Sequence, residues 1–307
     1  MLEKLIVNNL KNQLSIQEIK EKYNVDEMIE SEQEAWKTKE IPHPPKELFE
    51  VLKRANENGF TTFVPHFFPK KDFAKKIKWD YTITLGDIPK VKFFHKWPGL
   101  GVVPEKRYWL YIKEGSLPTN AAQLYNMWVL IDQIDQSIHN EEYEFKGDGL
   151  CQVLHQLRNE FKIHTPYASP VAISAKLLST TRCGTYWNEI HDHVLPTIAD
   201  IIQVDSEIIR LPTVIERNML SNLFPIEFPS QTIWEWAEDK LGQTDKKGIF
   251  TESKMNRIIT SGTHIDDNNT FGNVRNQRSD DDNRGCLSYH KTNLFSFRPM
   301  ITFPTKK

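Results

Sequence analysis

The chain has 307 residues, of which 39% are hydrophobic and 26% charged, so it can bury a core and is not a disordered tail. Its 39 Lys and Arg residues balance 41 Asp and Glu residues, which excludes a globally basic nucleic-acid-binding protein. The three cysteines, Cys151, Cys183 and Cys286, lie far apart without a C-x-x-C spacing. They predict no disulfide framework, and a reducing compartment is the simpler interpretation.

The first thirteen residues, MLEKLIVNNLKNQ, are charged and amphipathic. They contain no continuous apolar stretch and no small-residue cleavage site, so the sequence predicts no Sec signal. No segment approaches the roughly 18 apolar residues that a membrane-spanning helix needs. We therefore expect a cytoplasmic protein at synthesis, and display on a virion or cell surface would require another route.

The first 58 residues are expected to be helical. Ser15 and Glu18 have the spacing of a capping box, and a helix predicted over residues 46–58 follows a Pro-Pro pair and ends at Gly59. Part of this region also resembles half of a helix-turn-helix. No basic recognition helix follows it, so a solvated amphipathic hairpin is the favoured interpretation.

Residues 60–113 consist of β-branched and aromatic runs separated by Pro and Gly, a pattern typical of strands. The runs are GFTTFVPHFF, YTITLGDI, VKFFHKW and RYWLYIK. Apolar residues at helical spacing then predict helices over residues 120–138, 150–161 and 186–202.

His191 and His193 form an H-x-H pair within the last of these helices. Residues two apart on a helix do not face each other, and no third ligand lies at a motif spacing, so we expect no metal site. The sequence also contains no Gly-rich phosphate loop, H-E-x-x-H, G-x-S-x-G or paired-cysteine motif. We therefore expect no cofactor and no catalytic residues.

The C-terminal third contains a series of short motifs, of which the first is RLPTVIE. Thr213 and Glu216 within it have the spacing of a capping box, so a helix is predicted to begin at Thr213. The Thr hydroxyl would accept from the backbone near Glu216, and the Glu carboxylate would reach back to the amide of Thr213.

The next motif is IWEWAED, in which Trp234 and Trp236 would share one face of a strand, with Glu235 on the opposite face. Two further strands are predicted, one from RII at residues 257–259 and a final one from FRPMITF at residues 297–303.

RLPT-x-x-E, W-E-W, an Arg-led apolar strand and a terminal F-R strand follow the same order in formylglycine-generating-enzyme-type domains, and the present chain resembles that family over about residues 165–303. The typical family motifs are RLPTEAEWE, VWEWTSD, RVLRGGSW and GFR. The resemblance implies an α+β protein, with a C-type lectin-like domain over residues 161–307 preceded by a mixed helical and β accessory domain over residues 1–160. Chance strands and one capped helix are the alternative explanation of the same motifs.

The chain departs from the oxidases of that family in one important respect. These enzymes use a pair of cysteines after the R-G-G-S strand, whereas only Cys286 occurs in this region. A single thiol cannot form a redox pair or a two-thiolate copper site. The resemblance therefore implies the fold but not the oxidase chemistry, and we expect Cys286 to be a packed or inert thiol.

The segment SGTHIDDNNTFGNVRNQRSDDDNR, residues 261–284, has five Asn, five Asp and three Arg among its 24 residues. Such a segment cannot form its own core. The family resemblance places it on the ligand-facing surface of a C-type lectin fold. It also resembles the variable region of diversity-generating retroelement proteins, which precedes a terminal G-F-R-like strand and is rich in residues reached by mutating Asn codons at adenine. An ordinary polar surface loop remains the alternative.

We therefore expect a non-enzymatic protein whose C-terminal surface binds a protein or another macromolecule, with no nucleic-acid partner. The expected ligand-binding residues are Thr263, His264, Asp266, Asp267, Asn268, Asn269, Phe271, Asn273, Arg275, Asn276, Arg278, Ser279, Asp280, Tyr289, His290 and Asn293. Two alternatives stay open: an enzyme related to the formylglycine-generating oxidases, and nucleic-acid binding through the N-terminal helices. The sequence leaves open the ligand, calcium binding and the oligomeric state.

Overall fold

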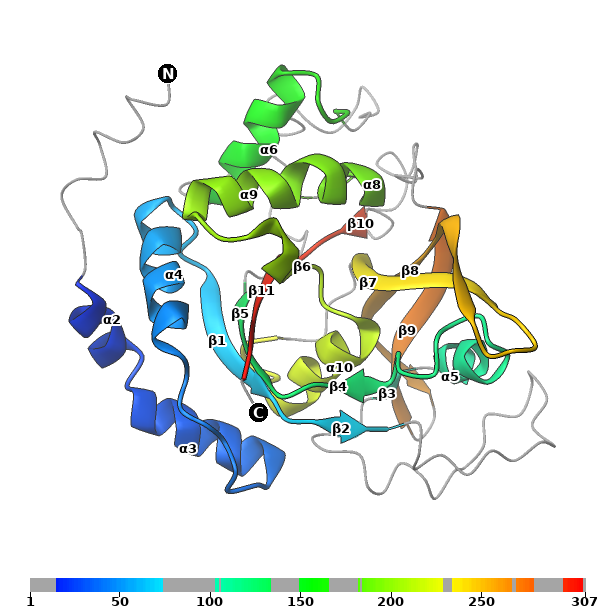
Figure 1. Cartoon of the computed structure of the whole chain (residues 1–307), viewed down its shortest axis with the longest axis horizontal. Helices are drawn as coiled ribbons and strands as arrows, with labels where there is room; N and C mark the ends of the chain where they lie inside the picture. Colours follow the sequence, from blue (N-terminus) through cyan, green and yellow to red (C-terminus); the bar gives the residue numbers. More distant parts are fainter. Residues whose placement is uncertain are drawn as a thin grey trace.

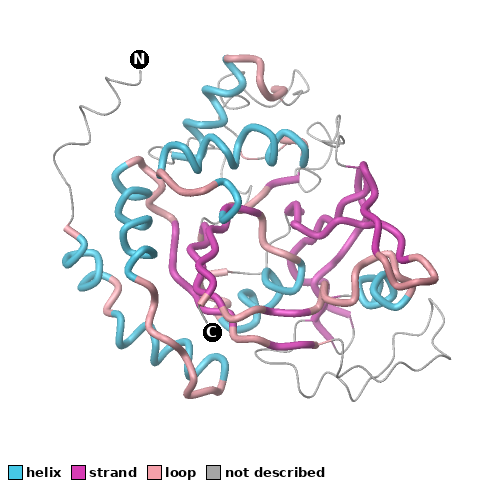
Figure 2. Tube along the Cα trace, in the orientation of Figure 1, coloured by secondary structure: helices cyan, strands magenta, loops and turns pink. Residues whose placement is uncertain are grey.

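The structure is a computed structural model. It describes residues 15–73, 103–104, 106–133, 149–165, 182, 184–228, 234–266, 269–278 and 295–305. Within these residues the architecture is a mixed α+β arrangement, with helices packed around two main sheets and a short two-stranded one (Figures 1 and 2). The α+β class predicted from the sequence is confirmed.

Three helices come first: α2 (Ile16–Lys22), α3 (Val25–Trp36) and α4 (Lys46–Glu57). The predicted capping box at the start of α2 is present, because Ser15 Oγ accepts from the Glu18 amide and Glu18 reaches back to the Ser15 amide. Gly59 follows α4 with φ of +84°, a left-handed conformation that glycine adopts without strain. In Figure 1, α2 and α3 lie at the outside of the molecule and α4 lies beside β1.

The first main sheet has the strand order β1-β5-β11-β6. Its strands are β1 (Phe63–Phe68), β5 (Met127–Asp132), β11 (Met300–Pro304) and β6 (Ile209–Arg210). β5 pairs antiparallel with β1 on one side and with β11 on the other. Strands from both sides of residue 160 therefore lie in one sheet.

The helix predicted over residues 120–138 is wrong, because this stretch contains β4 (Gln123–Leu124) and β5. Every residue of β5 is buried, so both faces of this central strand are covered. A strand buried on both faces has a continuous apolar sequence, which periodicity alone does not distinguish from a buried helix.

The second main sheet has the strand order β10-β7-β8-β9-β3. Its strands are β10 (Phe295–Ser296), β7 (Trp234–Thr244), β8 (Phe250–Asp266), β9 (Asn269–Arg278) and β3 (Val103–Pro104). β7, β8 and β9 are consecutive and antiparallel. A two-stranded sheet joins β2 (Lys71–Asp72) to β4.

The strand predicted from RYWLYIK is also wrong, because these residues form the helix α5 (Lys106–Lys113). Tyr108, Trp109 and Ile112 are buried at helical spacing, and the Trp109 indole donates to the Pro104 carbonyl at 3.0 Å. Burial of a helical face has outweighed the strand preference of the aromatic residues. The predicted strands YTITLGDI and VKFFHKW lie outside the described residues.

The remaining predicted helices are present. Residues 150–161 correspond to α6 (Gly149–Asn159), and residues 186–202 form α8 (Trp187–Glu189), a π-helical turn (Ile190–Val194) and α9 (Leu195–Ile202). Pro196, near the start of α9, has no amide hydrogen to donate, and the wider π turn lies directly before it. A 3-10 turn (Ser206–Ile208) and α10 (Val214–Leu223) follow.

The buried apolar residues form one continuous cluster that takes members from all parts of the described chain. Trp36 and Leu48 come from the N-terminal helices, Trp128 from β5, Trp236 from β7 and Phe303 from β11. Among the described residues, no helix is both long and apolar enough to cross a membrane.

Candidate functional site

The predicted ligand-binding residues fall on the β8–β9 pair and on the segments after it. For residues 261–266 and 269–278 the structure describes the backbone alone. The remaining candidates lie outside the described residues: Asp267, Asn268, Ser279, Asp280, Tyr289, His290 and Asn293. The structure thus brings nine of the sixteen candidates onto two paired strands.

The register of these strands divides the candidate positions into two sets. His264 lies opposite Phe271 and Asp266 opposite Asn269, whereas Thr263 lies opposite Gly272. Alternate positions of a strand belong to opposite faces of a sheet, and directly opposed positions share a face. One set, here called the polar row, consists of positions His264, Asp266, Asn269, Phe271, Asn273 and Arg275. The other, here called the apolar row, consists of positions Thr263, Ile265, Thr270, Gly272 and Val274.

Asn276 and Arg278 belong to the same face as the apolar row, opposite Ile258 and Asn256. The sixteen predicted residues therefore do not all share one face of the sheet.

The face of the sheet that holds the polar row continues in register to a buried tryptophan on β7. Position 275 lies opposite Ile259, which in turn lies opposite Trp236. Trp236 is 1% exposed, its indole donates to the Thr185 carbonyl at 3.0 Å, and its ring packs edge-on against Phe295. These contacts of Trp236 hold β7 in place, and β7 in turn pairs with the strand that carries candidate positions.

On the opposite face of β7, Glu235 is held between two arginines. Its Oε2 accepts from Arg217 Nε at 2.8 Å, and its Oε1 accepts from Arg298 Nη2 at 2.9 Å. Arg217 comes from α10 and Arg298 from the segment between β10 and β11, so the carboxylate links three parts of the chain. The prediction that Glu235 faces away from the tryptophans is confirmed.

This arrangement has a clear electrostatic cause. Burial alone would raise the pKa of Glu235, but the charges and hydrogen bonds of Arg217 and Arg298 outweigh it and lower the pKa to about 2. Arg298 also donates to the backbone carbonyl of Asp132, and the Asp132 carboxylate pairs with Arg182. Arg298 thus connects β5 of the first main sheet to β7 of the second.

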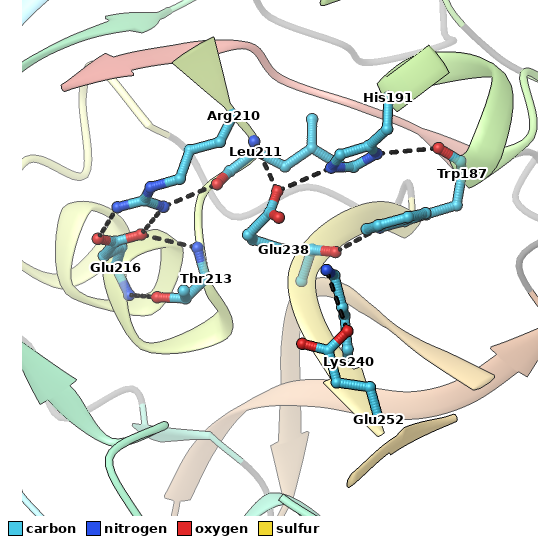
Figure 3. A network of polar contacts seen from close by, with 10 residues as sticks. Trp187, His191, Arg210, Leu211, Thr213, Glu216, Glu238, Lys240 and Glu252 are labelled. Carbon is cyan, nitrogen blue, oxygen red and sulfur yellow. Dashed lines mark hydrogen bonds and ion pairs between the residues drawn. The ribbon is translucent and has the colours of Figure 1, made fainter. Parts of the chain in front are cut away.

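The RLPT segment and the WEWAED strand are joined by hydrogen bonds from backbone amides to carboxylates. Leu211 N donates to Glu238 at 3.1 Å, and Val214 N donates to Asp239 at 2.6 Å. The Thr213 amide donates to Glu216 at 2.8 Å, which completes the predicted capping box (Figure 3). These carboxylates lie at the N-terminus of α10, where the helix dipole favours negative charge.

Arg210 forms a two-pronged pair with Glu216, with Nη1 to Oε2 at 2.7 Å and Nη2 to Oε1 at 2.6 Å. The neighbouring carboxyl group of Asp239 has no such cationic partner in these contacts, and burial raises its pKa to about 7. The hydrogen bond from Val214 opposes that rise, and the charge of Glu216 adds to it.

His191 extends this network to Trp187 (Figure 3). Its Nε2 lies 2.9 Å from Glu238 Oε2, its Nδ1 lies 2.9 Å from the Trp187 carbonyl, and its ring stacks on Trp187 at 3.5 Å. The Arg257 guanidinium lies 4.2 Å from the centre of the same indole. Both ring nitrogens of His191 are thus engaged within the protein, and no group of His, Cys, Asp and Glu suited to a metal ion occurs among the described residues.

Sequence reasoning identified Thr213, Glu216, Trp236 and Glu235, but it missed Arg217, Arg182 and Asp132. Arg217 carried one visible signal, since it is a charged residue in a helix whose neighbours Ile215, Met219 and Leu220 are apolar. The partners of Arg182 and Asp132 are distant in sequence, and no local pattern indicates them. Cys286 lies outside the described residues.

Comparisons with known proteins add no relative: no protein-family model, no curated protein and no solved structure matches the chain.

Proposed function

We propose that the protein is a non-enzymatic binding protein in which a C-type lectin-like scaffold presents the polar row of β8 and β9 to a protein ligand. The observation that carries this proposal is the separation of residue types by strand register. The polar row holds His, Asp, Asn and Arg around one Phe. The apolar row holds Thr, Ile, Gly and Val up to position 274, and Asn276 and Arg278 follow it on the same face.

The separation fits strands that, beyond the buried Ile259 and Trp236, turn one face toward the protein and one toward a partner. Val274 belongs to the apolar row and lies opposite Thr260, which lies opposite Glu235 on the face covered by α10. Antiparallel sheets with one face packed on the core show this alternation. The polar row carries Asp266 and Arg275 as its two charges of opposite sign, which suits a protein surface better than a polyanion.

The support beneath the strands favours presentation on a rigid base. Glu235 and Trp236 tie opposite faces of β7 to buried partners, and β7 pairs with β8. Sites built on strands with locked neighbours hold their geometry better than sites on loops. The coupling of RLPT to WEWAED also explains why these motifs occur together, in support of the proposed lectin-like scaffold.

The resemblance to retroelement variable proteins makes the polar row the expected location of diversification. The flanking DNA tests this part of the proposal. A near-copy of the codons for residues 261–298, differing only at adenines and beside a reverse transcriptase gene, would support it. Copies that differ at all four bases would contradict it.

The binding role is tested by two display libraries of the full chain. One library randomises the polar row and the other randomises the apolar row, and each is selected against lysozyme as a probe protein. We expect folded members and binders from the polar-row library, because exposed polar positions tolerate exchange within about 0.5 kcal/mol each. The apolar-row library should be depleted of folded members, since buried apolar truncations cost about 2 kcal/mol or more.

A third library, randomised at exposed positions Glu27, Glu30 and Glu34 of α3, is the control for non-specific selection. Equal numbers of lysozyme binders from this control library and the polar-row library would count against a dedicated surface. Loss of folding in the polar-row library would show that those positions belong to the core.

A further inference from the structure

The outer edge of β1 is covered by Tyr23, which follows α2, and by residues of α3. β1 is an end strand of its sheet, so backbone groups of alternate residues face away from β5. The Tyr23 hydroxyl donates to the Phe63 carbonyl at 3.3 Å, and the Phe67 backbone donates to the Glu32 carboxylate. Pro65 lies between these two positions and has no amide hydrogen to leave unpaired. Residues 23–36 are here called the cover.

Few residues of α3 are fully buried, although Val25, Met28 and Ala35 also pack in part against the core. The buried residues of this helix are Ile29, Glu32 and Trp36, and the middle one is a carboxylate that is 1% exposed. The helix begins after Asn24, which makes no side-chain capping bond, and a twelve-residue helix has little stability of its own. Docking of the cover therefore depends on how the Glu32 charge is balanced.

His66 on β1 supplies that balance. Its Nδ1 lies 2.8 Å from Glu32 Oε1 and its Nε2 lies 3.2 Å from Glu227 Oε2. The ring packs against Phe224 and Phe228, with centroid distances of 4.3 Å and 5.3 Å. A carboxylate stands beside each ring nitrogen, and only the doubly protonated imidazolium carries a donor on both.

The two neighbouring carboxylates favour the same state. Burial would lower the pKa of His66, but the hydrogen bonds and charges of Glu227 and Glu32 raise it to about 9. Arg217 and Arg298 lie beyond, over the Phe228 ring, and Lys71 lies 4.6 Å from the centre of the Trp36 ring. Burial raises the pKa of Glu32, and the charge of His66 opposes that rise.

We propose that the cover can undock reversibly from the edge of β1, and that the imidazolium of His66, between Glu32 and Glu227, keeps it docked. Removing the charge of His66 leaves Glu32 buried without a cation, which strongly disfavours the docked state. The cover then opens as a unit while α4 and the sheet stay folded.

The first experiment follows amide hydrogen exchange of the unmodified full chain at pH 7 and at pH 9.5, corrected for intrinsic exchange. The folded pKa of His66 lies above the unfolded value, so docking is strongest below pH 6.5 and weakens as the pH rises through about 9. We expect exchange in α3 to accelerate at least about tenfold at pH 9.5, with little change in α4. Equal acceleration in both helices would overturn the proposal.

Variants separate charge from packing at pH 7. His66→Gln should accelerate exchange in α3 at least about tenfold, and the double variant Glu32→Gln/His66→Gln should restore much of the protection, because it removes the buried carboxylate as well. Glu34→Gln, an exposed change on the same helix, is the matched control and should leave exchange unchanged. Two results would contradict the proposed role of His66. In one, α3 of the double variant exchanges as fast as α3 of His66→Gln; in the other, α3 of His66→Gln exchanges as slowly as α3 of the parent. If His66→Gln fails to fold, the pH comparison on the unmodified chain decides.

Discussion

Glu235 and Arg298, separated by 63 residues, form a buried ion pair in which Oε1 lies 2.9 Å from Nη2. The exposed fractions of the two residues are 4% and 1%. Because Arg217 approaches the other carboxylate oxygen at 2.8 Å, one anion serves two cations. This three-residue cluster connects α10, β7 and the segment before β11. It therefore helps to hold β7, and the strands β8 and β9 beside it, to the rest of the protein.

Replacing the carboxylate of this cluster should strongly destabilise the protein. Glu235→Gln leaves Arg217 and Arg298 buried without an anion, and breaking a buried pair in this way costs about 3–5 kcal/mol. Urea unfolding followed by tryptophan fluorescence measures the change in the free energy of unfolding. Glu252→Gln is the control, since Glu252 pairs with Lys240 at 3.2 Å near the surface and exposed pairs contribute about 1 kcal/mol or less. Equal losses in the two variants would contradict the structural role of the cluster.

The carboxyl group of Asp239 should make stability depend on pH near neutrality. Its folded pKa of about 7 lies above the reference value of 3.8, so its contribution is present at acid pH and is lost as the pH rises from 3.8 to about 7. Asp239→Asn keeps an oxygen to accept from Val214 but cannot ionise. We expect the melting temperature of this variant to exceed that of the parent at pH 8 and to approach it at pH 4. A difference that does not change with pH would show that Asp239 does not titrate in this range.

Thr213 should stabilise the start of α10 through its hydroxyl. Its Oγ1 accepts from the Glu216 amide at 3.3 Å, and losing an N-cap oxygen typically costs about 1 kcal/mol. Thr213→Ala is therefore expected to lower the unfolding free energy by about that amount in a guanidinium titration. Thr213→Ser retains the oxygen and should cost much less. If the Ser and Ala variants are equally destabilised, the methyl group rather than the cap is responsible.

The two tryptophans of WEWAED should differ in their effect on stability. Trp236 is fully buried, and Trp236→Ala should cost about 3–5 kcal/mol. Trp234 is half-buried, so Trp234→Ala should cost less and should leave a folded protein. Thermal unfolding of both variants gives the comparison, and the reverse order would contradict the assigned environments.

Local signals in the sequence were sufficient for much of the fold. The capping boxes at Ser15 and Thr213 depend on residues three apart, and both are present as predicted. The period-2 pattern of W-E-W likewise placed Glu235 opposite the tryptophans. Such features depend on neighbours along the chain, which a sequence displays directly.

Features set by distant contacts were not predictable in the same way. β5 has no alternating pattern because its side chains are buried on both faces of the sheet, and its Met127–Asp132 sequence is equally compatible with a buried helix. Arg217 and Arg298 meet Glu235 only because the chain returns to the same place. For the candidate site, composition indicated the β8–β9 region. Only the strand register shows that His264 and Thr263 belong to opposite faces of the sheet.

The position of β11 has a consequence for biosynthesis. β5 finds one of its two partners in β1, which the ribosome makes earlier, but the other partner is residues 300–304. Until those residues emerge, the nascent chain holds a largely apolar strand with one side unpaired, a state prone to association with other chains. Closure of this sheet therefore has to wait for residues 300–304, and a long-range pairing of this kind folds slowly.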